Sequence, residues 1–134
     1  MDCLFCQIAN RKKSAHVIYE DDAVAAVLDV FPRAVGHTLV LPKKHKETIL
    51  NFSGEELGRI FDGVRKTTEL LKSKLNPEGF TIGINHGKVS GQSIDHLHIH
   101  ILPRFADDGG GSIHSVVDCP PKESLEEIKN KIIS

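Results

Sequence analysis

The chain has 134 residues, of which 40% are hydrophobic and 26% are charged, and its formal net charge is -1 at pH 7. This length fits one globular domain over residues 1–134, and the near-neutral charge gives no basic field for nucleic acid. No apolar run is long enough to cross a bilayer, so we expect no membrane association. The N-terminus lacks the features of a secretory signal, which favours a cytoplasmic protein whose three cysteines form no disulfide framework.

The first half of the chain predicts a helical turn followed by three strands. These elements are expected at residues 5–9, 17–20, 23–30 and 37–41. The first two strands contain β-branched residues on both sides of an Asp21-Asp22 turn, as in an antiparallel hairpin. Pro32 and Gly36 interrupt any strand pairing, so the segment between the second and third strands is expected to be a loop.

The second half predicts one long helix, two further strands and a short last helix. Ser53 and Glu56 have capping-box spacing, and an amphipathic pattern follows over residues 54–75. Its apolar positions are Leu57, Ile60, Phe61, Val64, Leu71 and Leu75. The remaining elements are strands at residues 80–84 and 96–102 and a helix that begins after Ser124. Together these elements predict an α+β fold with a five-stranded antiparallel sheet, one main helix and a short C-terminal helix.

The most informative segment is residues 96–102, which read His-Leu-His-Ile-His-Ile-Leu. On a strand, His96, His98 and His100 would share one face, while the apolar residues between them fill the other face. Imidazoles near neutral pH can carry protons, attack phosphorus or bind a metal ion. A half-buried strand with histidines on its wet face is the alternative, but the strict alternation of three histidines favours function.

A turn directly before this strand has the composition of a phosphate site. Gly91 lets backbone N–H groups approach an anion, and the Ser93 hydroxyl adds another donor. The spacing is not that of a P-loop, and alone the tripeptide would be an ordinary turn. Its position beside the histidines favours phosphate binding.

Residues 91–104 resemble the signature of the histidine-triad (HIT) family of nucleotide hydrolases and transferases. The resemblance continues upstream through residues 28–30, 36–45 and 83–85 in the family's order, so it covers roughly residues 3–104. It implies a HIT-like fold and a reaction at the α-phosphate of a purine nucleotide or dinucleotide. The substrate would be a dinucleoside polyphosphate or another nucleotidyl ester, cleaved through a nucleotidyl-histidine intermediate.

The resemblance also implies a role for each matching residue. His98 would be the nucleophile, and His100 and His37 would donate to phosphoryl oxygens. Residues that would hold the phosphate are Asn85, Gly91, Gln92 and Ser93. Asp29 would bind the ribose hydroxyls, although an Asp at a strand end is otherwise a common turn former. Apolar residues that could line the base pocket, or simply form core, are Phe5, Ile8, Val27, Val30 and Leu39.

A second cluster of ligand-type residues involves the N-terminus. Cys3 and Cys6 have the spacing of a metal hairpin, but a closed zinc site needs four ligands. Resemblance to the HIT branch with this cysteine pair, and to galactose-1-phosphate uridylyltransferases, implies that His45 and His96 complete a structural zinc site. Two buried thiols or a redox pair are the alternatives, and the lack of a thioredoxin-like βαβ pattern favours zinc.

Three other readings of the function remain open from the sequence. One is a hydrolase in which the histidine row itself binds a catalytic metal, and another is a nucleotide sensor or scaffold with little turnover. The third is a nucleoside phosphoramidase of the Hint type. Hint proteins usually carry a C-terminal Trp, which this chain lacks, and the Leu102-Pro103-Arg104 ending resembles Fhit-like and prokaryotic members instead.

Two further expectations concern the rest of the molecule. Family members commonly pair two domains through the main helix and an edge strand, so the resemblance implies a homodimer. His16, His86 and His114 fit no pattern, and His16 and His114 are expected to be solvated residues outside the site.

Overall fold

The computed structural model describes residues 3–134, so the first two residues of the expected domain lie outside the described part. Its helices are α1 (Leu4–Ala9), α2 (Gly54–Leu75) and α3 (Leu125–Ile133), and its strands are β1 (Val17–Glu20), β2 (Val24–Leu28), β3 (Thr38–Pro42), β4 (Gly79–Gly83) and β5 (Ile99–Arg104). Three short 3-10 helices lie at Ile49–Asn51, Lys88–Ser90 and Ile113–Ser115. Within residues 3–134, no helix combines the length and the apolar composition that a membrane crossing would require.

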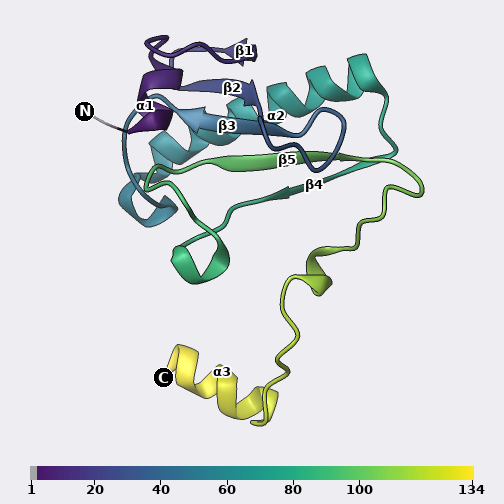
Figure 1. Ribbon diagram of the computed structural model, residues 1–134. Helices are drawn as coiled ribbons and strands as arrows, with labels where there is room; N and C mark the ends of the chain where they lie inside the picture. Colours follow the sequence, from purple (N-terminus) through teal and green to yellow (C-terminus); the bar gives the residue numbers. More distant parts are fainter. Residues whose placement is uncertain (1–2) are drawn as a thin grey trace.

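The five strands form one antiparallel sheet in the order β1-β2-β3-β5-β4 (Figure 1). This confirms the predicted α+β fold. The chain reaches β5 last, yet β5 lies between β3 and β4, with His100 opposite Leu39 on one side and Gly83 on the other. The histidine-bearing strand is therefore an interior strand, supported by neighbours on both sides.

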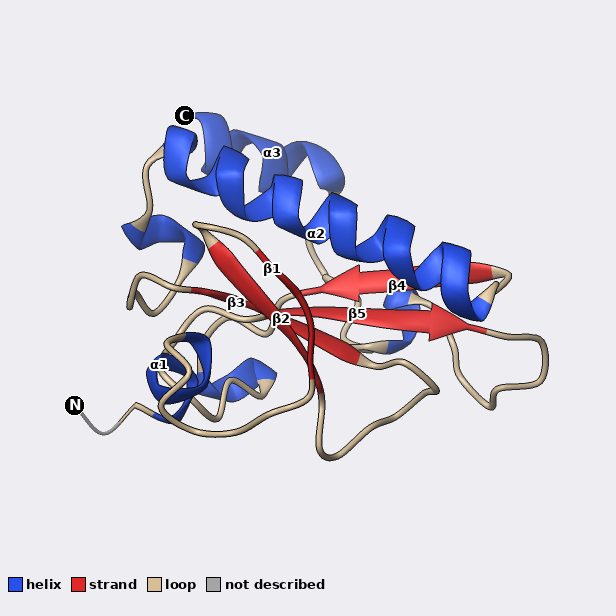
Figure 2. Ribbon diagram, turned by 90° about the horizontal axis from the view of Figure 1, so that it is seen from above, coloured by secondary structure: helices blue, strands red, loops and turns tan. Residues whose placement is uncertain are grey.

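The two faces of the sheet are covered by different elements (Figure 2). On one face, sheet residues pack under α2, and this core consists of Val24, Ala26, Val40, Leu97, Ile99 and Ile101 with Phe52, Ile60, Val64 and Leu71. On the other face a smaller core forms around α1 from Phe5, Ala9, Ala25, Val27, Leu39 and Leu41. Side chains alternate along each strand, so β2, β3 and β5 contribute to both faces. The face that carries α1 also carries the histidines.

Helix α2 begins at a capping box, as predicted. The Ser53 hydroxyl accepts from the Glu56 backbone N–H at 3.1 Å, and the Glu56 carboxylate accepts from the Ser53 N–H at 2.8 Å. At the other end Asn76 adopts a left-handed conformation with φ of 50°, which ends the helix. The observed bounds of α2 agree with the predicted helix over residues 54–75.

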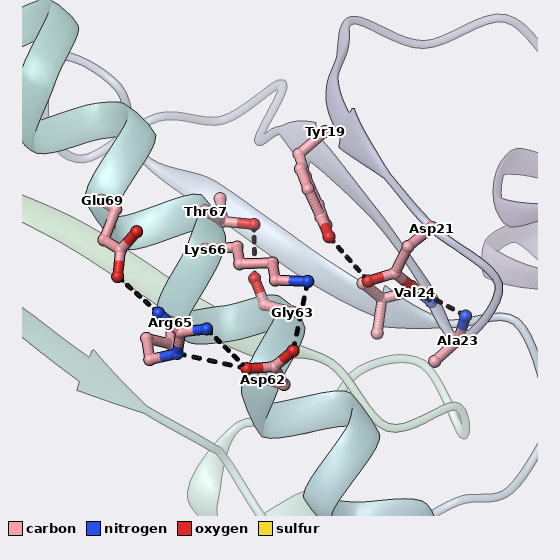
Figure 3. Close-up of polar contacts among 10 residues, drawn as sticks. All are labelled: Tyr19, Asp21, Ala23, Val24, Asp62, Gly63, Arg65, Lys66, Thr67 and Glu69. Atoms are coloured by element: carbon pink, nitrogen blue, oxygen red, sulfur yellow. Dashed lines mark hydrogen bonds and ion pairs between the residues drawn. The ribbon is translucent and has the colours of Figure 1, made fainter.

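The buried face of α2 differs in part from the amphipathic pattern. Phe61 and Leu75 are 42% and 37% exposed, whereas Gly63 and Thr67 are buried. A Cβ on Gly63 would lie 2.5 Å from a methyl group of Val24, so the absent side chain allows α2 to approach β2 closely (Figure 3). Thr67 satisfies its hydroxyl by donating to the Gly63 carbonyl at 2.7 Å. Close packing therefore buries two small residues, Gly63 and Thr67, that the hydrophobic pattern did not include.

The turn between β1 and β2 is held by one carboxylate (Figure 3). Asp21 accepts from the backbone N–H groups of Ala23 and Val24 at 2.8 and 2.9 Å, and from the Tyr19 hydroxyl at 2.7 Å. The hydrogen bond to Asp21 and burial raise the pKa of Tyr19 to about 12. The predicted turn at Asp21 and Asp22 fixes the register of the β1–β2 hairpin. The opposite end of this hairpin, at His16 and Leu28, lines a cavity.

The strand with the histidines begins later than predicted. Regular pairing of β5 starts at Ile99 and continues through Pro103 to Arg104, rather than running from residue 96 to residue 102. Local hydrogen bonds compete with strand pairing before that point, since the His96 N–H donates to the Ile94 carbonyl at 2.8 Å and the Leu97 N–H to the Lys46 carbonyl at 2.8 Å. Thus His96 and His98 precede the regular strand, and only His100 lies within it.

Residues 105–134 form an extended arm that leaves the sheet beyond β5 and ends in α3 (Figure 1). The predicted Ser124 cap is present, because its hydroxyl accepts from the Glu127 N–H at 3.1 Å. No residue of α3 is buried, and Leu125 and Ile132 are 80% and 76% exposed. The apolar side of this helix therefore has no partner within residues 3–134.

Candidate active site

A cavity of about 540 Å³ opens on the sheet face that carries α1 and the histidines. Its lining includes these residues that the sequence predicted for the site: Phe5, Ile8, Val27, Asp29, Val30, Leu39, Asn85, Gly91, Ser93, His98 and His100. The apolar members come from α1, β2, β3 and the loop after β2, and the polar members come from the end of β2, the segment between β4 and β5, and β5 itself. The arrangement offers an apolar slot next to a polar pocket, which suits an aromatic base joined to a phosphate.

One ring nitrogen of His98 is fixed by the backbone. Nδ1 of His98 donates to the carbonyl of His96 at 2.8 Å, and the ring is buried. A carbonyl can only accept, so in the neutral ring the proton lies on Nδ1 and the lone pair lies on Nε2. The edge of Phe5 packs against the imidazole with centroids 4.9 Å apart, which holds the ring in place. His98 therefore presents an unprotonated nitrogen to the cavity.

His37 and His100 form a relay that starts at a backbone amide. The Arg33 N–H donates to Nδ1 of His37 at 3.1 Å, so the proton of the neutral His37 ring lies on Nε2. That nitrogen is 2.9 Å from Nδ1 of His100, which accepts the hydrogen bond, so the proton of the neutral His100 ring lies on Nε2 and can be donated. His100 lines the cavity, so the donor is available to a bound group.

His37 was expected to donate to a phosphoryl oxygen, and the structure places it next to His100. The ring is buried and does not line the cavity, so it donates to His100 rather than directly to a phosphoryl oxygen. Burial lowers the pKa of His37, and the nearby Arg33 charge lowers it further against the opposing effect of Asp29. Burial and the neighbouring His98 and His37 lower the pKa of His100 to about 4. Both rings of the relay are therefore neutral at pH 7.

Asp29 lies at the end of β2 and serves two purposes. Its Oδ1 accepts from the Phe31 N–H at 2.8 Å, and its Oδ2 lies 3.4 Å from Nε2 of His37. The carboxylate also lines the cavity, so its remaining acceptor sites can receive hydrogen bonds from a ligand. The turn-forming role and the ligand-binding role considered from the sequence are thus compatible.

Gln92 was expected to hold the phosphate through its side chain or its backbone, and its side chain bonds to the backbone of neighbouring segments. Its Oε1 accepts from the Gly87 N–H at 2.9 Å, and its Nε2 donates to the carbonyls of Glu47 and Ile94 at 2.8 and 3.2 Å. The side chain is buried and does not line the cavity, and the two carbonyls use both of its Nε2 donors. Gln92 braces the loop that presents Gly91 and Ser93.

Sequence reasoning missed one polar side of the cavity. Lys13, Ser14 and His16 line it, although His16 was expected to lie outside the site. Hairpin pairing brings this segment close, since the Leu28 N–H donates to the His16 carbonyl at 3.0 Å, next to Asp29. The position of His16 could have been inferred from the predicted β1–β2 hairpin. Extending the strand pairing by one residue places His16 opposite Leu28, next to Asp29, the residue expected to bind the ribose.

A separate cluster joins the N-terminus to the segment before β5. Sγ of Cys3 and Sγ of Cys6 each lie 3.5 Å from Nδ1 of His96, and Nδ1 of His45 lies 3.2 Å from both Cys6 Sγ and His96 Nδ1. Nε2 of His96 donates to the Pro42 carbonyl at 2.8 Å, which leaves its lone pair on Nδ1. The two predicted cysteines and two predicted histidines are thus brought together and could hold one metal ion.

The donor set fits a metal better than it fits hydrogen bonds alone. One lone pair on His96 cannot serve Cys3, Cys6 and His45 together, whereas an ion at the centre would bind all four atoms. Ligand atoms about 2.0–2.3 Å from a tetrahedral ion are separated from one another by roughly 3.3–3.7 Å, close to the separations found here. Burial and the adjacent Cys3 thiol raise the pKa of Cys6, so a cation would be needed to favour two thiolates at this place.

A second group of metal-type ligands, formed by Asp29, His37 and His100, bears on the alternative of a catalytic metal. A metal would need the lone pair of His37 Nε2. The Arg33 N–H already requires an acceptor at Nδ1, which places the proton on Nε2. The backbone hydrogen bond therefore favours proton donation to His100 over metal binding at this group.

Comparison with known proteins agrees with the sequence motifs. Residues 10–107 match the HIT domain family. The chain belongs to the HIT family. It is 49% identical over 128 residues to an uncharacterized HIT-like protein of Methanocaldococcus jannaschii, covering 95% of this chain and 98% of that protein. The crystal structure of a HIT family member from Bacillus subtilis has a TM-score of 0.86 at 33% identity, covering 99% of this chain and 96% of that chain.

A more distant HIT relative has a functional name. The Arabidopsis thaliana protein named adenylylsulfatase is 32% identical over 107 residues, which are 80% of this chain and 54% of that protein. The matches confirm the resemblance inferred from residues 91–104, and this HIT protein has the family's nucleotide-binding hydrolase fold.

Proposed function

We propose that this HIT protein cleaves nucleotidyl esters at the α-phosphate through a covalent nucleotidyl-His98 intermediate. The observation that carries the proposal is the 2.8 Å hydrogen bond from His98 Nδ1 to the His96 carbonyl, which leaves Nε2 as a nucleophile at the cavity. A scaffold that only binds nucleotides would not need this tautomer. The Arabidopsis relative is named an adenylylsulfatase, which agrees with an adenylyl ester as the substrate.

Substrate binding would use the two sides of the cavity. The base would lie against Phe5, Ile8 and Leu39, and the ribose hydroxyls would donate to the Asp29 carboxylate. The α-phosphate would then lie between His98 and the loop that carries Ser93, with Asn85 on the same side. This placement brings phosphorus to the free nitrogen of the buried His98 ring.

The reaction would proceed in two displacements. A bond forms from His98 Nε2 to the α-phosphorus while the bond from phosphorus to the leaving oxygen breaks, and the leaving group takes the electron pair. The His96 carbonyl stabilises the positive charge of the His98 ring through Nδ1–H, and the His100 Nε2–H donates to a phosphoryl oxygen. Water then attacks phosphorus and loses one proton to solvent. The bond from phosphorus to Nε2 breaks, the electron pair returns to Nε2, and the mononucleotide is released.

We infer that zinc is the ion held by Cys3, Cys6, His45 and His96, because two thiolates and two imidazoles form a closed tetrahedral site that zinc prefers. The ion would supply a structural cross-link. Cys3 caps α1, which carries Phe5, and His96 provides the carbonyl that orients His98. The ion would therefore connect α1, which forms one wall of the cavity, to His96, whose carbonyl orients the proposed nucleophile His98.

We also infer a cytoplasmic homodimer in which the arm of each protomer packs on the other. The exposed apolar side of α3 supports this, and so does β4, a short edge strand with Ile82 41% exposed. Leu125→Asp combined with Ile132→Asp should convert a dimer to a monomer in sedimentation experiments without changing the helical content. A monomeric wild-type protein would contradict this part of the proposal.

The central experiment is to trap the intermediate. The purified protein would be mixed separately with diadenosine tetraphosphate, adenosine phosphosulfate and an adenosine phosphoramidate, quenched within one turnover and examined by mass spectrometry. A nucleotidyl adduct on His98, absent from His98→Ala and present in the exposed-residue control His114→Ala, is the expected result. Nucleotide binding without adduct or product from any of the three would instead support a sensor or scaffold. The order of the three rates separates an ester hydrolase from a phosphoramidase of the Hint type.

A further inference from the structure

We propose that Lys13 recognises the base of the bound nucleotide and gives the site a preference for the 6-oxopurines guanine and hypoxanthine over adenine. The inference rests on the proposed function, because it requires a nucleotide whose α-phosphate lies at His98. Lys13 and Ser14 both line the cavity of about 540 Å³, although no sequence motif pointed to either of them. Both residues are exposed, so a ligand in the cavity can reach them.

Two backbone contacts place Lys13 between the end of α1 and the start of β1. The N–H of Lys13 donates to the Gln7 carbonyl at 3.1 Å, so the chain folds back over the last turn of α1. The His16 carbonyl then accepts from the Leu28 N–H at 3.0 Å, which joins the same segment to the end of β2. Lys13 therefore lies where the slot between α1 and the sheet ends, beside the turn of α1 that carries Ile8.

The catalytic histidines lie at the other end of the cavity. His100 is on β5, and the sheet order β1-β2-β3-β5-β4 puts three strand spacings between β5 and β1. At about 4.8 Å for each spacing, the two backbones are roughly 14 Å apart. The imidazole at one end and the lysine side chain at the other leave room for about one nucleoside monophosphate between them. With the α-phosphate at His98 and the ribose at Asp29, the far edge of the base therefore points toward Lys13.

The charges in the cavity are distributed in an unusual way for a site that binds a phosphate. Among the lining residues within residues 3–134, Lys13 is the only lysine or arginine and Asp29 is the only carboxylate. Lys13 takes part in none of the ion pairs found in that part of the chain, so its ammonium donors are available to a ligand. The donors at the phosphate end are the His100 ring and Ser93 instead. The lysine therefore serves the base rather than the phosphate.

The edge of the base decides which purine fits best. Phe5, Ile8 and Leu39 would cover the faces of any purine alike, so discrimination falls to the polar edge. Guanine and hypoxanthine present two neighbouring acceptors, O6 and N7, whereas adenine presents the N7 acceptor beside the N6 amine, which is a donor. A lysine ammonium only donates, so it bonds both acceptors of a 6-oxopurine but opposes the amine of adenine. The Ser14 hydroxyl donates or accepts and therefore fits either base.

Binding of mononucleotides tests the assignment without the chemical step. The wild-type protein should bind GMP and IMP about 10-fold more tightly than AMP in calorimetry, because a lysine on O6 and N7 discriminates by about that factor or more. IMP lacks the 2-amino group, so equal affinities for GMP and IMP would locate recognition at O6 and N7. 7-Deaza-GMP, which lacks the N7 acceptor, should lose part of the advantage. AMP keeps the ribose and phosphate contacts, so adenylyl esters remain substrates.

Substitutions of Lys13 should change the order of the bases. Lys13→Met should bring the affinities for GMP and AMP within about 2-fold of each other, because the cation is lost. Lys13→Gln should reverse the order, since a glutamine amide pairs with both N6 and N7 of adenine, and Lys13→Arg should keep the preference for GMP. The matched control is Lys12→Gln. Lys12 is the adjacent exposed lysine, but it does not line the cavity, so neither affinity should change.

Other results would overturn the inference. Equal binding of GMP and AMP by the wild-type protein, or an equal loss of both in Lys13→Met, would show that Lys13 does not recognise the base. A nucleotidyl adduct on His98 would still support the proposed function in that case. Tighter binding of adenosine 3′,5′-bisphosphate than of GMP would assign Lys13 to a phosphate on the ribose instead. Absence of binding by every nucleotide, together with absence of a His98 adduct, would overturn both proposals.

Discussion

Two histidines only two positions apart, His96 and His98, are oriented in opposite ways by the backbone. His96 donates from Nε2 to the Pro42 carbonyl and directs Nδ1 at two thiols, whereas His98 donates from Nδ1 to the His96 carbonyl and exposes Nε2 to the cavity. The same side chain is thus oriented as a metal ligand would be in one place and, in the proposed reaction, as a nucleophile in the other. The carbonyl that each ring meets, rather than the residue type, decides which nitrogen is free.

Removing the His98 ring tests its proposed role as the nucleophile, and we expect this substitution to have the largest effect on activity. His98→Ala is expected to lower kcat by at least about 10³-fold, because the variant loses the Nε2 lone pair that the bond from Nδ1 to the His96 carbonyl leaves free at the cavity. Circular dichroism should show an unchanged fold, and the zinc content should match that of wild type. Residual activity near the wild-type level would show that another residue attacks phosphorus.

Breaking the Cys–His cluster tests the other side. Cys6→Ala should abolish stoichiometric zinc and lower the Tm by roughly 10 °C, because the cross-link from α1 to His96 is lost. Activity should fall less than in His98→Ala, by about 10-fold, since His98 keeps its ring but loses a rigid carbonyl partner. Cys119→Ala provides the control, because Cys119 is exposed and outside the cluster. Unchanged zinc binding in Cys6→Ala would remove the cluster from consideration as a metal site.

The pH dependence of stability tests how the catalytic rings are kept neutral. Burial and the neighbouring histidines lower the pKa of His100 from 6.5, the value of an unperturbed imidazole in an unfolded chain, to about 4 in the folded protein. Below pH 6.5 His100 is protonated in the unfolded state but stays neutral in the folded state. The free energy of unfolding is therefore highest above pH 6.5 and decreases progressively as the pH falls toward 4. Urea denaturation at pH 7.0 and 4.5 should show that His100→Gln reduces this loss by roughly 2 kcal/mol. An equal loss in wild type and variant would contradict the neutral relay.

The smallest effect is expected at the edge of the catalytic cluster. Asp29→Asn should raise KM for a ribonucleotide substrate by about 10-fold, because a neutral amide accepts hydrogen bonds from the ribose less strongly than a carboxylate does. A substrate that lacks both ribose hydroxyls should lose the difference between wild type and variant. If the difference persists with that substrate, Asp29 acts through His37, 3.4 Å away, and not through the ribose.

The histidine segment, residues 96–102, shows which features of the site a sequence pattern can predict and which it cannot. Alternation predicted that three rings share one face, and it correctly drew attention to His98 and His100, which line the cavity. It did not predict that β5 starts at Ile99, because the hydrogen bond from Leu97 to Lys46 joins segments that are distant in the sequence. Nor did it predict that the side-chain amide of Gln92 would donate to the carbonyls of Glu47 and Ile94.

The sequence by itself determined the elements and the inventory of chemical groups. Local rules were enough for α2, whose Ser53 cap and Asn76 end agree with the predicted helix, and for the hairpin around Asp21. The tertiary structure decided which atom of each histidine is free, that Arg33 lies beside His37, and that Lys13 lines the cavity. The reason is physical: capping and turn formation depend on neighbours along the chain, whereas a tautomer and a pocket depend on carbonyls and walls supplied by distant segments.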